Sequence, residues 1–453
     1  MITVIGTGTG APLPPDATAA VAGAALVVGA RRHLATVSAS VTVAEGAEQV
    51  VLGALAPALD TIEEYVGKER PVVVLASGDP GFFGIVRALA ERFGAGRLDV
   101  RPGVSSVAAA FARAGLTWDD AVVVSAHGRE PRTAVNVCRA RPKVAVLTGP
   151  GAGPAELGSA LVGGPARVLV VASALGDPEL ERVERVTPAE AAARDWGDAV
   201  SVVLCLDEAR ALAPVRVTVA GESVGPAQWA LDEREFAHRD SMITKFEVRA
   251  LALARLGPRL GDLVWDIGAG SGSVAVECAR LGAAVVAVEK TPDGAERVRA
   301  NAAAHGVDVR VVEGSAPDDL PSPSELGLGL GLGLDEPDAV FIGGGGRELP
   351  AIVAACAGRA RRTVVVAMAA LDRVPAVRAA LIGAGLDCDG VLLQSSRLAP
   401  LPGEVTRLAA TNPVFLLWGT RPTAHTDRRT DRRTDRSVDR SVDSHTGSEG
   451  DAL

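Results

Sequence analysis

The stretch LVWDIGAGSGSVAVECARL, residues 263–281, begins with a short apolar run, passes through alternating glycines and continues into a segment rich in Ala and Val. A short apolar run that ends at a glycine turn predicts a buried strand, and the segment after the turn predicts a helix. Such a crossing is typical of a Rossmann-like sheet, in which glycines let the backbone approach a ligand at the helix N-terminus. We therefore expect a cofactor to contact Gly268, Ala269, Gly270, Ser271 and Gly272.

The spacing of these glycines discriminates between cofactors. A dinucleotide fingerprint is G-x-G-x-x-G, whereas here the third glycine comes one residue early and Ser273 stands where the fingerprint has its last glycine. The spacing resembles the S-adenosylmethionine (SAM) loop of class I methyltransferases. Glu289 ends the next apolar run, and a carboxylate at such a strand end can accept both ribose hydroxyl protons. NAD enzymes use an acid in the same way, so Glu289 alone does not distinguish a SAM site from an NAD site.

Two later runs extend the resemblance to class I methyltransferases. The sequence EGSAP, residues 313–317, follows the third predicted strand and is similar to the adenine-side loop of that family, with Ser315 where the family usually has an acid. The resemblance implies that Ser315 and Ala316 contact the cofactor. After the fourth predicted strand comes FIGGGG, residues 341–346, where the family has its catalytic or substrate loop. Gly344 is therefore expected to contact the substrate.

A motif upstream of the glycine loop narrows the family. The sequence ITKFEVRA, residues 243–250, predicts by itself an amphipathic helix with Ser241 or Thr244 as its N-cap. Together with the glycine loop that follows it, the motif resembles the C-terminal module of the family precorrin-6Y C(5,15)-methyltransferase (decarboxylating) of cobalamin biosynthesis. The resemblance covers roughly residues 231–417. It implies that Thr244 contacts SAM, and we expect a catalytic role for Lys245.

The first half of the chain carries a second set of glycine loops. GTGTG at 6–10, SGDPG at 77–81 and RPGVSS at 101–106 each follow an apolar run. With SAHGR at 125–129 and LTGP at 147–150, they resemble tetrapyrrole (class III) methyltransferases, in which such segments line a SAM cleft between two α/β halves. The resemblance implies that the cofactor contacts Gly6, Gly8, Ser77, Gly78, Asp79, Pro80, Ser105, Ser106 and Thr148.

Candidate catalytic and substrate-binding groups lie near these loops. His127 stands at a predicted strand end, where an imidazole can shuttle a proton, and Asp79 is a second catalytic candidate. The family's substrate carries many carboxylates, which Arg side chains bind in bidentate pairs. We therefore expect substrate contacts from Arg129 in the first half and from Arg249 and Arg347 in the second. No metal site is implied.

Composition sets further bounds on the protein. The chain has 453 residues, of which 48% are hydrophobic, and length alone suggests two or three domains. A net charge of −9 and an aromatic content of 3% disfavour nucleic-acid binding. The N-terminus has no basic n-region, and the longest apolar stretch, residues 17–30, is too short to span a bilayer. We expect a cytoplasmic protein that binds no membrane, keeps its cysteines reduced and forms a homo-oligomer, as relatives of both modules often do.

The predicted fold class is α/β, since short Val-rich runs alternate with Ala-rich helical stretches in a largely parallel arrangement. The two resemblances imply a two-lobed tetrapyrrole methyltransferase fold followed by a Rossmann-like class I SAM methyltransferase, and we expect the second domain to end in a pair of strands near 389–398 and 412–417. The predicted divisions are a first domain at 1–206, a linker at 207–228, a second domain at 229–419, a low-complexity insert at 321–334 and a disordered tail at 420–453.

The resemblance implies a specific reaction. The first domain would methylate C-5 of a reduced tetrapyrrole, and the second would methylate C-15 and release carbon dioxide from the ring-C acetate, converting precorrin-6B into precorrin-8. Three alternatives stay open: SAM-dependent methylation of another porphyrinoid, an NAD-dependent oxidoreductase, and a non-catalytic scaffold. The early third glycine at Gly272 disfavours the oxidoreductase, and complete loops in both halves disfavour the scaffold.

Overall fold

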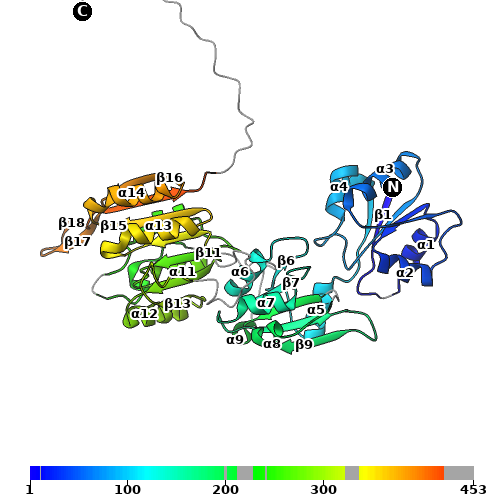
Figure 1. Ribbon diagram of the computed structural model, residues 1–453, viewed down its shortest axis with the longest axis horizontal. Coiled ribbons are helices and arrows are strands. Elements are labelled where there is room, and N and C mark those ends of the chain that lie inside the picture. The colour runs from blue at the N-terminus through cyan, green and yellow to red at the C-terminus, as the bar shows by residue number, and fades with distance from the viewer. Residues whose placement is uncertain (11, 198–200, 212–227, 240–241, 322–335, 423–453) are drawn as a thin grey trace, which may run out of the picture.

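The structure is a computed structural model that describes residues 1–10, 12–197, 201–211, 228–239, 242–321 and 336–422. Three large sheets, each with its own helices, follow one another along the long axis of the molecule (Figure 1). The first two sheets are the lobes of the first domain, and the third belongs to the second domain. Most of the predicted linker, insert and tail lies outside the described residues. None of the described helices has the length and apolar character that crossing a membrane requires.

The first lobe is a fully parallel sheet in the order β3-β2-β4-β1-β5. Its apolar strands lie between α1 and α2 on one face and α3 and α4 on the other, and each face packs a separate core. The elements are β1 (Ile2–Gly6), α1 (Pro15–Ala22), β2 (Leu26–Gly29), α2 (Arg31–Ser40), β3 (Glu48–Val51), α3 (Leu55–Gly67), β4 (Val72–Ala76), α4 (Val86–Phe93), η1 (Ala95–Arg97) and β5 (Leu98–Arg101).

The second lobe is a mixed sheet in the order β6-β7-β10-β8-β9. Only β6 and β7 pair in parallel, while β10 is antiparallel to both of its neighbours and β9 is antiparallel to β8. The elements are α5 (Ser106–Ala114), β6 (Val122–Ser125), α6 (Arg132–Ala140), β7 (Lys143–Leu147), α7 (Pro154–Leu161), β8 (Val168–Ser173), β9 (Arg182–Val186), α8 (Pro188–Ala192), β10 (Ser201–Leu206) and α9 (Glu208–Ala211).

The second domain is a seven-stranded sheet in the order β13-β12-β11-β14-β15-β19-β16, parallel except for β19. Its elements are η2 (Glu233–Glu235), α10 (Phe246–Leu256), β11 (Leu263–Ile267), α11 (Ser273–Arg280), β12 (Ala284–Glu289), α12 (Pro292–Ala304), β13 (Arg310–Glu313), β14 (Ala339–Ile342), η3 (Gly346–Glu348), α13 (Leu349–Arg359), β15 (Thr363–Met368), η4 (Leu371–Arg373), α14 (Val374–Gly383), β16 (Asp387–Leu393), β17 (Ser396–Leu401), β18 (Val405–Ala410) and β19 (Val414–Thr420).

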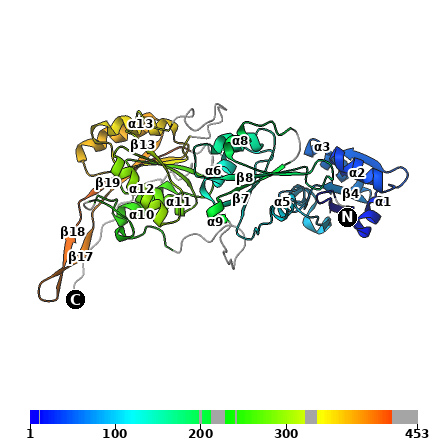
Figure 2. The ribbon, with the colours of Figure 1, turned by 90° about the horizontal axis from the view of Figure 1, so that it is seen from below.

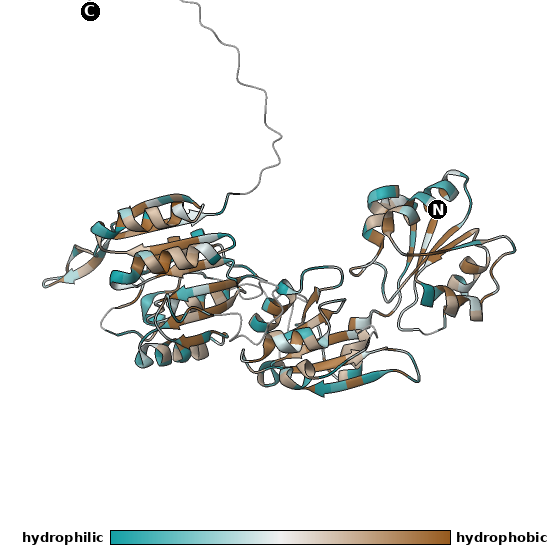
Figure 3. Ribbon diagram, in the orientation of Figure 1, coloured by the Kyte–Doolittle hydropathy of each residue, from teal (hydrophilic) through white to brown (hydrophobic). Residues whose placement is uncertain are grey.

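Helices cover both faces of this third sheet. Helices α10, α11 and α12 pack on one face, and α13 and α14 pack on the other, so the apolar strands are enclosed on both sides (Figure 3). Continuous apolar strands are typical of a parallel sheet whose two faces are buried. The predicted Rossmann-like second domain is confirmed by this layering and strand order.

Several predicted details are wrong. The final pair of strands is in fact four strands, because β17 and β18 form a two-stranded hairpin where Pro400, Pro402 and Gly403 had obscured the pattern. The first domain is less uniformly parallel than predicted because β10 runs antiparallel. The second domain also extends beyond residue 419, since Thr420 ends β19 and the Arg421 guanidinium donates to the carbonyl oxygens of Ala357, Ala360 and Ala384.

Helix α6 of the first domain packs against the second domain. It lies across the amino ends of neighbouring strands of the third sheet: the Asn136 amide donates to the Gly261 carbonyl oxygen before β11 at 3.1 Å, and Arg132 pairs with Asp338 before β14 at 2.7 Å. Beyond the helix, Arg167 pairs with Asp308 before β13 at 2.9 Å. Both guanidinium groups are almost fully buried. Buried ion pairs are expensive to break one partner at a time, so this contact holds the domains in a defined arrangement.

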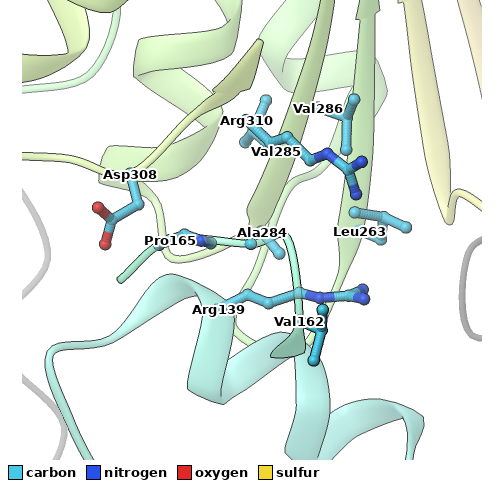
Figure 4. Close-up of a pocket in the computed structure, with 10 residues that line it drawn as sticks. Arg139, Val162, Pro165, Leu263, Ala284, Val285, Val286, Asp308 and Arg310 are labelled. Atoms are coloured by element: carbon cyan, nitrogen blue, oxygen red, sulfur yellow. The ribbon is translucent and has the colours of Figure 1, made fainter. Parts of the chain in front are cut away.

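A pocket lies at the same boundary (Figure 4). Arg139, Val162 and Pro165 of the first domain face strands β11 and β12 of the second. The lining residues are Arg139, Val162, Gly164, Pro165, Leu263, Ala284, Val285, Val286, Asp308 and Arg310. This pocket touches the amino ends of the strands, whereas the predicted cofactor loops follow their carboxyl ends. It is therefore a gap in the domain contact and is separate from the predicted sites.

Candidate active sites

The glycine loop of the second domain lies at the topological switch point of the sheet. The chain leaves β11 in one direction and β14 in the other, and ligands bind in the crevice that such a divergence creates. The two loops touch: a Cβ on Gly268 would lie 3.2 Å from the Gly344 main chain, and Gly268 has a positive φ of 71°. The structure therefore brings Gly268 and Gly344, predicted to serve cofactor and substrate, into direct contact.

The loop's outer half faces solvent and its inner half is buried. Gly268 is exposed and Ala269 and Gly270 are half-buried, whereas Ser271 and Gly272 are buried. The Ser271 hydroxyl accepts a hydrogen bond from the Ser273 amide at 3.4 Å, so its side chain serves the start of α11. Cofactor contacts from this loop can thus come from the first three residues and from main-chain atoms.

Glu289 lies beside the loop at the end of β12. Its Oε2 accepts a hydrogen bond from the Gly270 amide at 2.9 Å, and its Oε1 accepts from the amide and hydroxyl of Thr291 at 3.1 and 2.8 Å. A carboxylate offers about four acceptor positions, so Oε2 retains capacity for a further donor. The side chain is 7% exposed. Glu289 therefore fixes the glycine loop and can still accept a ligand hydroxyl.

A second carboxylate, that of Asp266, supports the helix that follows the loop. Asp266 in β11 is buried, and its Oδ2 accepts from the Ala275 amide at 2.9 Å in the first turn of α11. Desolvation raises the pKa of Asp266 to about 7. Asp266 was not among the predicted site residues, although an acid inside an otherwise apolar strand is a signal that could have identified it.

The adenine-side loop contains a second residue that was not predicted from the sequence, Asp319. Ser315 is exposed, and its amide donates to Asp319 Oδ2 at 2.7 Å. Asp319 is exposed and supplies an acid close to the position where the family's usual one is replaced by Ser315. Ala316 is buried in the core between the sheet and α13, which leaves its side chain little surface for a cofactor.

The segment before α10 carries the remaining candidates of the second domain. Thr244 and Lys245 are half-buried, and Lys245 occupies the N-cap position without a side-chain cap, so Thr244 is not the cap that the sequence suggested. Ser241, the other predicted cap, lies outside the described residues. Instead, Glu233 Oε1 accepts from the Phe246 amide at 2.9 Å and caps the helix from a distance.

Arg249 is not a substrate ligand. Its side chain has no exposed surface, and its guanidinium donates to the carbonyl oxygens of Thr244, at 2.6 Å, and of Leu231. It also lies 3.4 Å from the fully buried Glu277 carboxylate. The prediction of a substrate contact is therefore wrong, because a buried charge needs these internal partners. Arg347, by contrast, is exposed in η3, just after the Gly344 loop.

Three loops of the first lobe converge on one another at the carboxyl ends of β1, β4 and β5. The Gly78 amide donates to the Gly8 carbonyl oxygen at 2.9 Å. A Cβ on Gly6 would lie 2.4 Å from the Gly78 carbonyl oxygen and 2.5 Å from the Gly103 amide nitrogen. No side chain fits at Gly6, so glycine is required for the predicted cofactor segments to meet.

The polar residues of these loops differ in how open they are. Ser77 is exposed, but its hydroxyl already bonds to Arg32 at 2.7 Å and to His33 at 3.0 Å. Asp79 is half-buried, and its Oδ1 accepts from the Gly81 amide at 2.8 Å. Pro80 is buried beside them. Asp79 thus shapes the turn, and its cofactor and catalytic roles remain predictions.

Two further residues start α5 on the side of the second lobe. Ser105 is the N-cap of this helix and accepts from the Ala108 amide at 3.1 Å, while Ser106 is its first residue. Both are half-buried. The loop that carries Ser105 and Ser106 lies against Gly78, since a Cβ on Gly78 would be 3.3 Å from Ser105 Cα. Helix α5 itself packs on the sheet of the second lobe, so this loop links the lobes.

The second lobe contributes loops that reach the first. His127 and Arg129 are exposed and follow β6, and the Arg129 guanidinium lies 5.8 Å from the ring centroid of Phe83, which follows β4 of the first lobe. This contact spans the two lobes. His127 Nδ1 lies 3.3 Å from the Thr148 carbonyl oxygen. The Thr148 hydroxyl donates to the Ser201 carbonyl oxygen at 2.6 Å. The cofactor contact of Thr148 stays a prediction, and we expect it from the main chain of this residue.

The described residues contain no group of three or more His, Cys, Asp or Glu side chains arranged to hold a metal. The sites of both domains are instead built from glycine loops with flanking carboxylates, hydroxyls and cations. Residues 1–192 match the family described as Tetrapyrrole (Corrin/Porphyrin) Methylases, and residues 235–415 match the family described as Precorrin methyltransferase domain. Fold and site thus define a protein of two methyltransferase domains.

Relatives identify the family of the whole chain. The chain is 38% identical to the precorrin-6Y C(5,15)-methyltransferase [decarboxylating] of Sinorhizobium sp, over 77% of this chain and 79% of the relative. It is 35% identical to the probable cobalt-precorrin-6B C(15)-methyltransferase (decarboxylating) of Pyrobaculum calidifontis, over 39% of this chain and 87% of the relative. It is 33% identical to the cobalt-precorrin-7 C(5)-methyltransferase of Salmonella typhimurium, over 46% of this chain and all of the relative.

The chain belongs to the precorrin-6Y C(5,15)-methyltransferase (decarboxylating) family. The resemblance inferred from the motifs is thereby confirmed for both halves of the chain. Membership makes the protein a methyltransferase of cobalamin biosynthesis.

Proposed function

We propose that the chain uses SAM in both domains to methylate precorrin-6B at C-5 and C-15 and to decarboxylate its ring-C acetate, which yields precorrin-8. The first domain would act at C-5, and the second at C-15 and on the acetate. The observation that carries the proposal is the presence of two complete glycine-loop sites in one chain whose full-length relatives are named for both reactions. The separate relatives named for C(5) and for C(15) methylation support the division of labour.

The second site carries hydrogen-bond acceptors that suit SAM. Glu289 retains an acceptor position for a ribose hydroxyl beside Gly270, and Gly268 and Gly344 leave room for a ligand to approach the main chain. Exposed Asp319 offers a further acceptor near Ser315. In the first domain, the loops at Gly6, Gly78 and Ser105 form a similar side-chain-poor platform. These glycine loops, with the acceptors beside the second one, support the proposal of the same methyl donor in two different folds.

Methyl transfer asks the protein for alignment and exclusion of water. Bound SAM supplies an electrophilic methyl group on a sulfonium whose departure as a neutral thioether is favourable. The accepting carbons are enamine-like positions of the macrocycle, so no protein nucleophile is needed, and orientation of the two reactants is the main contribution. Loss of carbon dioxide leaves an electron pair that the conjugated imine system of the substrate accepts. His127 and Lys245 are the groups we propose to move or hold protons.

Exposed cations would bind the carboxylates of the tetrapyrrole. Arg129 lies at the contact between the two lobes, and Arg347 follows the Gly344 loop. Charge-assisted pairs with carboxylates are among the stronger hydrogen bonds and would orient the macrocycle over each donor. We propose these two residues as substrate ligands. Arg129→Gln and Arg347→Gln should raise the KM for the tetrapyrrole without weakening SAM binding.

We further propose that the protein is a cytoplasmic homo-oligomer. The β17–β18 hairpin projects from the second domain (Figure 2), and Leu398 and Leu408, which pair across it, are 79% and 67% exposed. Such exposed apolar side chains on a projecting arm favour contact with a second copy. Leu398→Glu should lower the mass measured by light scattering, whereas Leu371→Glu, at a 65% exposed leucine in η4, should not. A wild-type chain that measures as a monomer would contradict this proposal.

Mass spectrometry of the product tests the main proposal. The protein is incubated with precorrin-6B and SAM, and the product should have gained two methyl groups and lost carbon dioxide. Parallel incubations with other tetrapyrroles and with NAD separate the alternatives. Turnover of another porphyrinoid in preference to precorrin-6B, or binding of NAD without binding of SAM, would contradict the assignment.

A further inference from the structure

Arg397 lies at the centre of an ion-pair cluster in the second domain. It is in β17, where the projecting hairpin leaves the body of the domain (Figure 2). Its guanidinium donates to both oxygens of Glu233, at 2.8 Å each, and to both oxygens of Glu247, at 3.0 and 2.6 Å. One planar fork thus binds two carboxylates that come from different elements, η2 and α10.

Glu233 connects this cluster to the segment that carries Thr244 and Lys245. The same carboxylate that binds Arg397 also accepts from the Phe246 amide at 2.9 Å, which is the first amide of α10. At the other side of the segment, Arg249 donates to the Thr244 carbonyl oxygen at 2.6 Å. The segment is therefore held at both ends, by a buried arginine on one side and by the Glu233–Arg397 pair on the other.

Removing the positive charge would leave two carboxylates facing one another. Arg397 holds the pKa of Glu233 down at about 2, and it lowers the pKa of Glu247 as well, so both are ionised at neutral pH. The negative charge of Glu233 opposes ionisation of Glu247, which shows that the two groups repel. Further charges near the cluster include Lys245, which stabilises ionised Glu233, and buried Arg249, whose charged form Glu277, Glu233 and Asp232 stabilise.

We propose that Arg397 is a positioning residue for the donor site of the second domain, because it fixes Glu233 and through it the Thr244–Lys245 segment. This inference rests on the proposed use of SAM by that domain. In this proposal Arg397 acts through Glu233 and Glu247, the two carboxylates that its guanidinium binds. Exposed single ion pairs contribute little, but a fork that satisfies two carboxylates, one of which caps a helix, constrains three chain segments at once.

Calorimetric titration of the full chain with S-adenosylhomocysteine, the demethylated donor, tests the proposal. The wild-type chain should show two sites, one for each domain, and the site that Glu289→Gln weakens is assigned to the second domain. Arg397→Gln should weaken binding at that site by about tenfold and leave the first-domain site unchanged, which serves as an internal control for folding. Arg397→Lys keeps the charge but loses the planar fork, so its affinity at the second-domain site should lie between those of the wild type and Arg397→Gln.

Two further variants sharpen the test. Arg407 is exposed on β18, on the same face of the hairpin, so Arg407→Gln is the matched control and should bind like the wild type. Adding Glu247→Gln to Arg397→Gln removes the repulsion between the carboxylates and should restore part of the affinity. Unchanged binding at both sites in Arg397→Gln would overturn the positioning role alone. Weakening of both sites together with a lower unfolding temperature would overturn it in favour of a general structural role. A wild-type chain without any site would overturn the proposed function and this inference with it.

Discussion

The two proposed donor sites of this chain are built in different ways. In the first domain, main chain meets main chain: Gly6, Gly78 and Gly103 pack so closely that the loops leave no space for a side chain at Gly6. In the second domain, a carboxylate organises the loop, since Glu289 accepts from the Gly270 amide while Asp266 supports the helix beneath. The first site should therefore be sensitive to added volume and the second to lost charge.

The largest effect is expected from added volume in the first site. Gly6→Val places a Cβ against the Gly78 carbonyl oxygen and the Gly103 amide and must push the loops apart. S-adenosylhomocysteine binding at that site should weaken by about a hundredfold or more, with the other site unaffected. Gly53→Val is the control, because a Cβ there meets nothing within 4 Å. Equal effects of the two substitutions in calorimetry would show that close packing of the loops around Gly6 does not shape this site.

Lost charge in the second site should have the next largest effect. Glu289→Gln keeps the shape of the side chain but removes the carboxylate that accepts from Gly270 and Thr291. Binding at the second site should weaken by about tenfold, as expected when a hydrogen bond to a charged group is lost. Glu296→Gln, at an exposed acid on α12, is the matched control. Weakening of the first site by Glu289→Gln, with the second site unchanged, would contradict the placement of this carboxylate at the second site.

The pH dependence of stability should also distinguish the domains. Because the pKa of buried Asp266 is raised to about 7, the folded protein holds this proton more tightly than the unfolded chain, whose pKa is about 4. The stability that this group contributes is complete below about pH 4 and falls by roughly 1 kcal/mol per unit until about pH 7. The unfolding transition of the second domain should show this fall, and Asp266→Asn should flatten it. Parallel pH profiles for the two proteins would exclude Asp266 as the source.

The smallest effect is expected at Ser77. Its hydroxyl is already bonded to Arg32 and His33, so it is directed into the first lobe. Ser77→Ala should change affinity at the first site by less than about threefold, which is the scale of most surface substitutions. The same titration measures it, and a loss as large as that of Gly6→Val would show that the hydroxyl contacts the donor after all.

The sequence was most informative where a loop needed a special backbone. The glycines at 6, 78, 268 and 344 were all assigned to sites, and the structure brings them together in pairs. The sequence was least informative where ion pairs between distant segments decide whether a charged residue lies in the core or at the site. Arg249 has the type and position of a substrate ligand, yet Glu277 and two carbonyl groups hold it in the core.

Strands without a clear apolar pattern were also missed. Edge strands β3 (Glu48–Val51) and β9 (Arg182–Val186) carry charged residues because one side of each meets solvent. The hairpin of β17 and β18 contains Pro400, which sequence patterns associate with loops. Arg397 pairs with Glu233, which is far from it in the sequence, and only the folded chain identifies that partner.

The central claim, that each domain holds its own methyl donor, is tested most directly by the stoichiometry of S-adenosylhomocysteine binding to the intact chain. The account predicts two sites per chain in calorimetry, of which Gly6→Val removes one and Glu289→Gln weakens the other. A single site in the wild-type chain, or loss of the same site in both variants, would contradict it.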